Sequence, residues 1–203
     1  DFSYDRKTMM EKIILPSART IIMDHHKTAE AALGGILDEL RDKYQVRRAD
    51  DRVVFDMKRC GSSILYDELD AAAGKKAGFY RPKLDGQREL WLIDYIEDRD
   101  LWTKKLEYSE EVSAYIASIP FTFKNWDAIN ALGRVQVAEG GRAIKRYIDL
   151  FGVKVREEAV TEDLGDGPVP TINTPYMNCS EHVGLLAEEN PEAKYAVGYF
   201  RRK

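Results

Sequence analysis

The chain has 203 residues with a hydrophobic share of 44%, which suits one large folded domain or two small ones. No stretch reaches the ~18 uninterrupted apolar residues of a membrane helix, and the first residues lack the basic start and apolar core of a signal peptide. The net charge of −4 excludes a global basic field that would bind nucleic acid non-specifically.

The first hundred residues alternate between helical and strand patterns. Apolar spacing predicts a helix over 6–15, and an Ala- and Leu-rich composition predicts another over 28–44. Short apolar runs at 20–23 and 53–55 predict buried strands, and the second is followed by a helix over 62–69. This alternation is typical of a parallel α/β sheet that binds ligands at the C-terminal ends of its strands.

The second half of the chain is predicted to be helical until its composition changes. Residues 73–87 are rich in Gly, Lys and Pro and are predicted to form a loop, after which a helix begins and 109–147 is mainly helical. From Val153 onward, spaced valines and a Gly- and Pro-rich stretch predict strands. A helix over 180–189 and a strand over 195–200 complete a second, smaller α/β unit.

The most specific sequence feature is the tripeptide Asp24-His25-His26, at the end of the first predicted strand. The chain has only three histidines, and two of them are adjacent here. Divalent manganese accepts imidazole and carboxylate ligands. Adjacent residues point in different directions, so one histidine can bind a metal while the other faces a substrate. For the bare tripeptide, a capping Asp beside two partly exposed histidines is the structural alternative.

The longer string Met23-Asp24-His25-His26-Lys27-Thr28-Ala29 resembles the signature of the DHH phosphoesterase superfamily. This group includes RecJ-type exonucleases, oligoribonucleases, cyclic-dinucleotide phosphodiesterases, exopolyphosphatases and family II inorganic pyrophosphatases. Further resemblances follow in the family's order, and they lie at 1–4 (second motif), 55–63 (the strand, loop and helix after the signature), 95–102 (fourth motif) and 178–181 (start of the C-terminal substrate domain).

The resemblance implies an α/β fold in three parts. These are a parallel-sheet DHH catalytic domain over 1–108, a helical linker over 109–152, and a second, smaller α/β domain of the DHHA1-like type over 153–203. The implied activity is hydrolysis of phosphodiester bonds in short oligonucleotides or small nucleotides by metal-activated water, with Mn²⁺ as cofactor and Mg²⁺ as its alternative. The alternative functions are an exopolyphosphatase-like phosphoanhydride hydrolase and a non-catalytic binding module on the same scaffold.

Site residues carry over from the family position by position. Asp1 would bridge two metal ions, and His25 would be a metal ligand. Asp24 would orient an imidazole from behind the metal, and His26 would face the substrate phosphate. Two metals ~3.5–4 Å apart can activate a bridging water and neutralise the phosphate that it attacks.

Further site residues come from the fourth motif and from a helix start. The resemblance implies Asp98 as another metal ligand, with Asp94 and Asp100 as less favoured choices. Gly61 and Ser62 would offer backbone N–H groups to phosphate at a helix N-terminus, although they equally fit an ordinary serine-capped helix start.

The other candidate residues have structural interpretations. His182 is predicted to lie on the surface of a helix. The two cysteines, Cys60 and Cys179, are predicted to be packed or idle thiols, and their small number indicates a reducing cytoplasm. The chain has three tryptophans, Trp91, Trp102 and Trp126, and all three are predicted to be core aromatics.

Two family features are missing from the chain. It lacks the first motif, an Asp-x-Asp pattern before the second motif, and it lacks the Gly-Gly-Gly-His type of loop in the substrate domain. Two interpretations follow, a fragment of a longer enzyme, which we favour, and a short relative that cannot complete the site. Without the first motif we expect one weakly bound metal or none. A sheet without its central strand would expose edges and favour homo-oligomers. The expected partners are short oligonucleotides or nucleotides, and neither a membrane nor long duplex nucleic acid.

Overall fold

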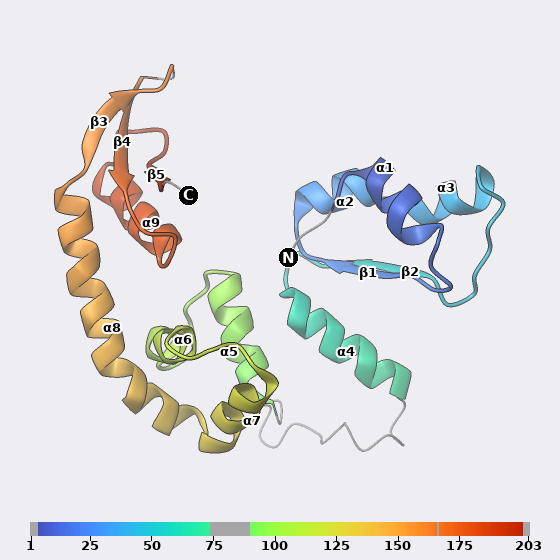
Figure 1. Ribbon diagram of the computed structural model, residues 1–203, viewed down its shortest axis with the longest axis horizontal. Helices are drawn as coiled ribbons and strands as arrows, with labels where there is room; N and C mark the ends of the chain where they lie inside the picture. Colours follow the sequence, from blue (N-terminus) through green and yellow to red (C-terminus); the bar gives the residue numbers. More distant parts are fainter. Residues whose placement is uncertain (1–3, 74–89, 166, 201–203) are drawn as a thin grey trace.

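The computed structural model describes residues 4–73, 90–165 and 167–200, which form a mixed α/β fold. Figure 1 shows an N-terminal α/β unit, a central group of helices, and a C-terminal α/β unit at the end of one long helix. The elements in chain order are α1 (Arg6–Thr8), η1 (Met9–Ile14, π-helical), β1 (Ile21–Asp24), α2 (Lys27–Leu33), α3 (Ile36–Asp42), β2 (Arg52–Phe55), α4 (Gly61–Ala73), α5 (Trp91–Asp100), α6 (Ser109–Ala117), α7 (Phe123–Leu132), α8 (Arg134–Glu157), β3 (Val160–Asp163), β4 (Pro168–Asn173), α9 (Cys179–Glu189) and β5 (Val197–Tyr199).

The N-terminal unit is built on a parallel pair of strands, β1 and β2. Ile22 is in register with Val53, and Asp24 is in register with Phe55. Figure 1 shows the pair lying between α1 to α3 on one face and α4 on the other. Both short apolar runs are therefore strands, as predicted, and parallel pairing brings their C-terminal ends to one edge of the sheet.

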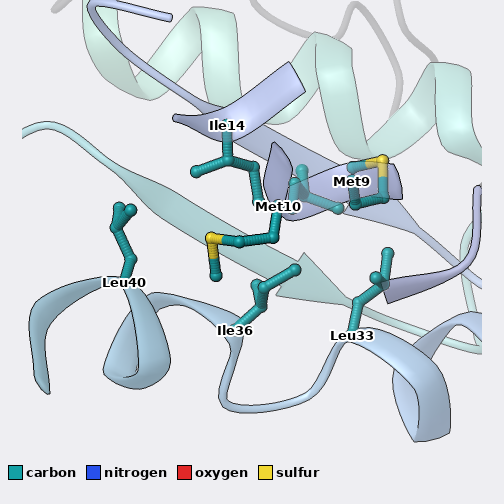
Figure 2. Packing of buried hydrophobic residues seen from close by; sticks show 7 residues of the cluster. Met9, Met10, Ile14, Leu33, Ile36 and Leu40 are labelled. Carbon is teal, nitrogen blue, oxygen red and sulfur yellow. The ribbon is translucent and has the colours of Figure 1, made fainter. Parts of the chain in front are cut away.

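The core of this unit lies between the sheet and the helices of its first face. Its buried side chains come from η1, β1, α2 and α3 (Figure 2). In η1 the backbone bonds run between residues five apart, as in the bond from Leu15 N to Met10 O, and this spacing directs Met9 and Ile14 to the same side. The labelled core residues are Met9, Met10, Ile14, Leu33, Ile36 and Leu40.

The single helix predicted over 28–44 is instead two helices, α2 and α3. Gly34 and Gly35 separate them, and Gly35 has a φ of 69°, a left-handed conformation that favours glycine. The break redirects the chain so that Leu33 and Ile36 both reach the core, although they lie on either side of the glycine pair.

The central helices enclose a second core. Leu92 and Tyr95 of α5 pack there with Val112 of α6, Ile129 of α7 and Val137 of α8. The connector helix α8 continues to Glu157, so the strand-like interpretation of 153–155 is wrong. The first strand of the C-terminal unit, β3, begins only at Val160.

The C-terminal unit is a three-stranded sheet in the order β3-β4-β5 with α9 against it. The pair β3 and β4 is antiparallel, while β4 and β5 are parallel. The predicted helix over 180–189 and the predicted strand over 195–200 are both confirmed. The predicted loop at 73–87 lies almost wholly outside the described residues. Within the described ranges, no helix is long and apolar enough to cross a membrane.

The N-terminal core predicts a stability test on two leucines. Leu33 is fully buried, whereas Leu69 of α4 is 60% exposed. We expect Leu33→Ala to lower the free energy of unfolding by about 2–5 kcal/mol, because it removes buried methyl groups and leaves a cavity. The matched control Leu69→Ala should change it by less than about 0.5 kcal/mol. Urea denaturation measures both values, and equal effects would contradict this description of the core.

Candidate metal centre

The candidate centre begins where β1 ends. The apolar run of β1 stops at Asp24, and the chain then turns through His25 and His26 into α2, whose first residue is Lys27. The neighbouring strand leaves the sheet at the same edge, where Asp56 N donates to Asp24 O at 3.1 Å. The tripeptide therefore lies at the C-terminal edge of the parallel pair, where α/β sheets bind ligands.

The buried carboxylate of Asp24 organises this turn. Its Oδ1 accepts hydrogen bonds from the backbone N–H groups of His25 (2.7 Å) and His26 (2.9 Å), and lies 2.8 Å from Nδ1 of His26. Burial raises the pKa of Asp24, but the hydrogen bonds from His26 and His25 outweigh burial and hold that pKa below its usual value. An ionised carboxylate only accepts hydrogen bonds, so Nδ1 of His26 donates in this contact, and in a neutral imidazole Nε2 then keeps its lone pair.

Asp100 lies against His25 from another part of the chain. It is the last residue of α5, and its Oδ2 lies 3.3 Å from Nε2 of His25. The side chain of His25 is only 8% exposed, and its ring meets the ring of His26 edge to face. Two ligands about 2.1 Å from one ion at roughly right angles lie about 3 Å apart. The His25–Asp100 separation therefore fits two ligands of one divalent cation.

The donor set also fits a metal in its chemistry. Potential ligand atoms of Asp24, His25 and His26 all lie within 4.8 Å of one another. With Asp100, the site combines imidazole nitrogens and carboxylate oxygens, which suit Mn²⁺ and several other divalent ions. Asp24 already uses Oδ1 for the turn, so His25 and Asp100 are the better placed pair. Asp1, another predicted ligand, lies outside the described residues.

Asp98 is not brought to this site. It lies two residues before Asp100, about 200° further round the helix, and so faces away from His25. Its buried carboxylate accepts hydrogen bonds from the hydroxyl of Thr103 and from the backbone N–H groups of Lys105 (2.8 Å) and Leu106 (3.2 Å). Asp98 therefore fixes the loop after α5, and its predicted role as a metal ligand has no geometric support.

Asp94 shares the face of α5 that carries Asp98. Both residues line a pocket of about 550 Å³, together with Trp91 and Arg134. The resemblance implies Asp94 and Asp100 as metal ligands that are less favoured than Asp98. Helical periodicity separates them, because Asp94 lies one turn from Asp98 on the same face, whereas Asp100 lies about 200° from Asp98 round the helix.

The predicted phosphate-binding helix start lies beside α5. Gly61 is the first residue of α4, and the preceding residue, Cys60, donates its N–H to Glu97 Oε2 at 3.0 Å. The hydroxyl of Ser62 lies 2.9 Å from the Cys60 sulfur, which is buried as predicted. The α4 N-terminus thus packs against the same face of α5 as Asp100. Its N–H groups stay a candidate phosphate contact, with no further observation in support.

Comparison with known proteins does not assign the chain to a family. No known protein family and no solved structure matches the chain. Over 127 residues, 63% of the chain, the sequence is 28% identical to a protein of Acanthamoeba polyphaga mimivirus described as uncharacterized. The match covers 24% of the viral protein, so the chain spans about a quarter of the length of this relative.

The loop role of Asp98 predicts a pH-dependent stability. Burial raises the pKa of Asp98, but hydrogen bonds from Ser109, Thr103 and two backbone N–H groups outweigh burial and lower it. The stabilisation is thus complete above the unfolded-state pKa of about 4 and is lost as the pH falls through the lower folded-state pKa. Asp98→Asn should cost about 1–3 kcal/mol at neutral pH, because an amide NH₂ then faces backbone donors.

Unfolding of wild type and Asp98→Asn by urea across the acid range measures this difference. The gap between the two proteins should shrink below about pH 4. The matched control is Asp127→Asn, at an exposed position of α7. A gap that stays constant with pH would show that the carboxylate charge of Asp98 does not stabilise the loop.

The Asp24–His26 contact predicts the tautomer of His26. In metal-free protein at about pH 8, beyond the ordinary imidazole range, ¹⁵N NMR should find the hydrogen of His26 on Nδ1. Asp24→Asn should shift the population toward the Nε2–H form, because the amide can donate to Nδ1. His182, far from the turn in sequence, provides the internal control. An unchanged His26 tautomer in Asp24→Asn would argue against this contact.

Proposed function

We propose that the chain carries part or all of the active site of a metal-dependent phosphoesterase. The observation that carries the proposal is the pairing of His25 with Asp100 beside the Asp24–His26 contact, at the C-terminal edge of a parallel strand pair. The likeness of residues 23–29 to the DHH signature supports the same chemistry. The proposed reaction is hydrolysis of a phosphodiester bond by a metal-activated water.

His25 and Asp100 would hold the cation in this proposal. Their side chains come from two elements, so each limits the position of the other, and His25 is nearly enclosed by protein. A divalent ion, when bound, lowers the pKa of a coordinated water and neutralises charge on the phosphate. The proposed cofactor is Mn²⁺, with Mg²⁺ as the alternative.

His26 is the proposed catalytic residue facing substrate. Its side chain is 48% exposed, in contrast to that of His25, and Asp24 fixes its ring through Nδ1. Nε2 is thus directed away from Asp24 and can accept a proton or, in the imidazolium, donate one to an oxygen of the phosphate or leaving group. Asp24 acts through His26 by holding the orientation of its ring.

The proposed substrate is a short oligonucleotide or a small nucleotide diester. A net charge of −4 gives no general attraction to a long polyanion, so affinity has to come from the cation and from local contacts. Short substrates with one scissile phosphate near a metal meet this condition.

The proposal predicts the residues on which manganese binding depends. Asp100→Asn and His25→Ala should each weaken Mn²⁺ binding by at least about tenfold, because each removes one ligand. Isothermal titration calorimetry of the full chain measures the affinity. Asp127→Asn and Asp98→Asn are the controls and should bind as wild type does. Weakening in Asp98→Asn with none in Asp100→Asn would transfer the ligand role to Asp98.

The proposal also predicts hydrolysis of a 5′-labelled RNA dinucleotide by the 203-residue chain with Mn²⁺. His26→Ala should reduce turnover by about 100- to 10,000-fold with little change in Mn²⁺ affinity, because it removes a proton donor. Faster cleavage of pyrophosphate than of the dinucleotide would favour a phosphoanhydride hydrolase. Binding of Mn²⁺ and dinucleotide without cleavage by this folded chain would reject hydrolysis by the chain and favour a binding module.

A further inference from the structure

A second candidate ligand site lies on the other side of the α5 C-terminus from the candidate metal centre. It is a pocket of about 680 Å³ between the loop after α5 and the helices α6, α8 and α9. Pockets of this volume suit small organic molecules. Small and apolar residues make much of its wall, and they include Ala114, Ala117, Ile148, Gly152, Gly184 and Leu185.

His182 places one hydrogen-bonding group in this wall. It was predicted to lie on the surface, yet it is only 2% exposed. Its Nδ1 lies 2.9 Å from the hydroxyl of Thr174, whereas Nε2 has no hydrogen-bond partner within the described part of the chain. A buried nitrogen without a partner is costly and rare in folded proteins. A ligand that reaches His182 would supply the missing partner.

Gly152 keeps space around this nitrogen, and Gly184 keeps space elsewhere in the pocket wall. A Cβ atom at Gly152 would stand 3.1 Å from Nε2 of His182, so a side chain there would crowd the ring. Gly184 lies within α9, where glycine disfavours the helix, yet beyond its chain neighbours and the backbone of its own helix no atom lies within 4 Å of the place its Cβ would take. Packing within the described chain therefore gives no reason for Gly184, and the space beside it belongs to the pocket.

Trp102 and Lys104, which line the same pocket, have a strained backbone conformation. Their φ angles are 54° and 48°, which bulky side chains rarely adopt. Trp102 was predicted to be a core residue, but it is 47% exposed, with Arg99 and Lys104 over its ring at 4.9 and 5.3 Å. Strain of this kind concentrates at ligand sites, because the fold holds a side chain where binding needs it.

The charges around the pocket balance. Four basic side chains line it, Arg99, Lys104, Lys145 and Arg156, and four acidic ones oppose them, Glu110, Asp149, Glu181 and Glu188. Several are paired across the pocket, as Lys145 is with Glu110 at 3.5 Å and Arg99 is with Glu181. A balanced, internally paired rim gives no net attraction to a strongly charged ligand and favours an uncharged one.

We propose that this pocket binds an uncharged planar heteroaromatic molecule of the nucleoside class, which packs against Trp102 and hydrogen-bonds Nε2 of His182. The ring edge of such a molecule carries donors and acceptors for the buried nitrogen, and its face matches the indole. This site is distinct from the candidate metal centre and requires no cation, so it goes beyond the proposed hydrolysis.

The test is a titration of the full 203-residue chain with adenosine in the presence of a chelator. Because the chain has three histidines, ¹⁵N NMR of the imidazoles resolves His182, and His182→Gln assigns its signals. Adenosine should shift Nε2 of His182 in a saturable manner and leave His25 and His26 unchanged. Ribose, which lacks the ring, should produce no shift.

Variants locate the binding. Gly184→Leu fills the pocket from α9 and should weaken adenosine binding by about tenfold or more, while thermal unfolding should show an intact fold because the space is open. Trp102→Ala should weaken binding by about tenfold through loss of stacking. If Gly184→Leu proves unstable, Ala117→Phe fills the pocket from an exposed position of α6.

Three outcomes would overturn the proposal. They are the absence of a saturable shift of His182 with both adenosine and uridine, equal binding of ribose, and unchanged adenosine affinity in the folded pocket-filling variant. A failure of manganese-dependent hydrolysis would leave this result untouched, since no metal is present.

Discussion

The last turn of α5 determines how the parts of this chain meet. Four consecutive charged residues form that turn, and successive side chains on a helix point about 100° apart. Glu97 accepts a hydrogen bond from the start of α4, Asp98 holds the following loop, Arg99 pairs with Glu181 of α9, and Asp100 meets His25. One helical turn thereby connects the N-terminal unit, the central helices and the C-terminal unit through polar contacts.

Asp98 and Asp100 make different contacts and therefore have different roles. Asp98 is buried and saturated with donors from its own loop, so its charge stabilises local structure. Asp100 is partly exposed and faces an imidazole, which leaves it able to bind an ion. Arg99, between them, lines the pocket beside α9. The candidate metal centre and the proposed nucleoside site are therefore neighbours along the chain on different faces of one helix.

The sequence predicted the parts of the fold that depend on local pattern. The short apolar runs became β1 and β2, and the placement of Asp24, His25 and His26 at a strand end is confirmed. Residue type alone could not show that Asp100, and not Asp98, lies against His25, because this depends on which face of α5 packs toward the turn after β1. The prediction that His182 lies on the surface was wrong for a similar reason, because α8, which covers its ring, is distant in sequence. The prediction of one continuous helix over 28–44 was wrong. It gave more weight to the many helix-forming residues than to the left-handed conformation of Gly35, which ends the first helix and begins the second.

The pairing of His25 with Asp100 joins side chains that are far apart in sequence, and this has a consequence for assembly. Closing so long a loop costs chain entropy before the contact can form, so the centre is completed only when α5 docks on the N-terminal unit. An ion held by both residues would bind the docked state and not the separated one. By mass action, ion binding and docking are then linked equilibria, and the cation would act as a cross-link that sets the melting temperature of the whole chain.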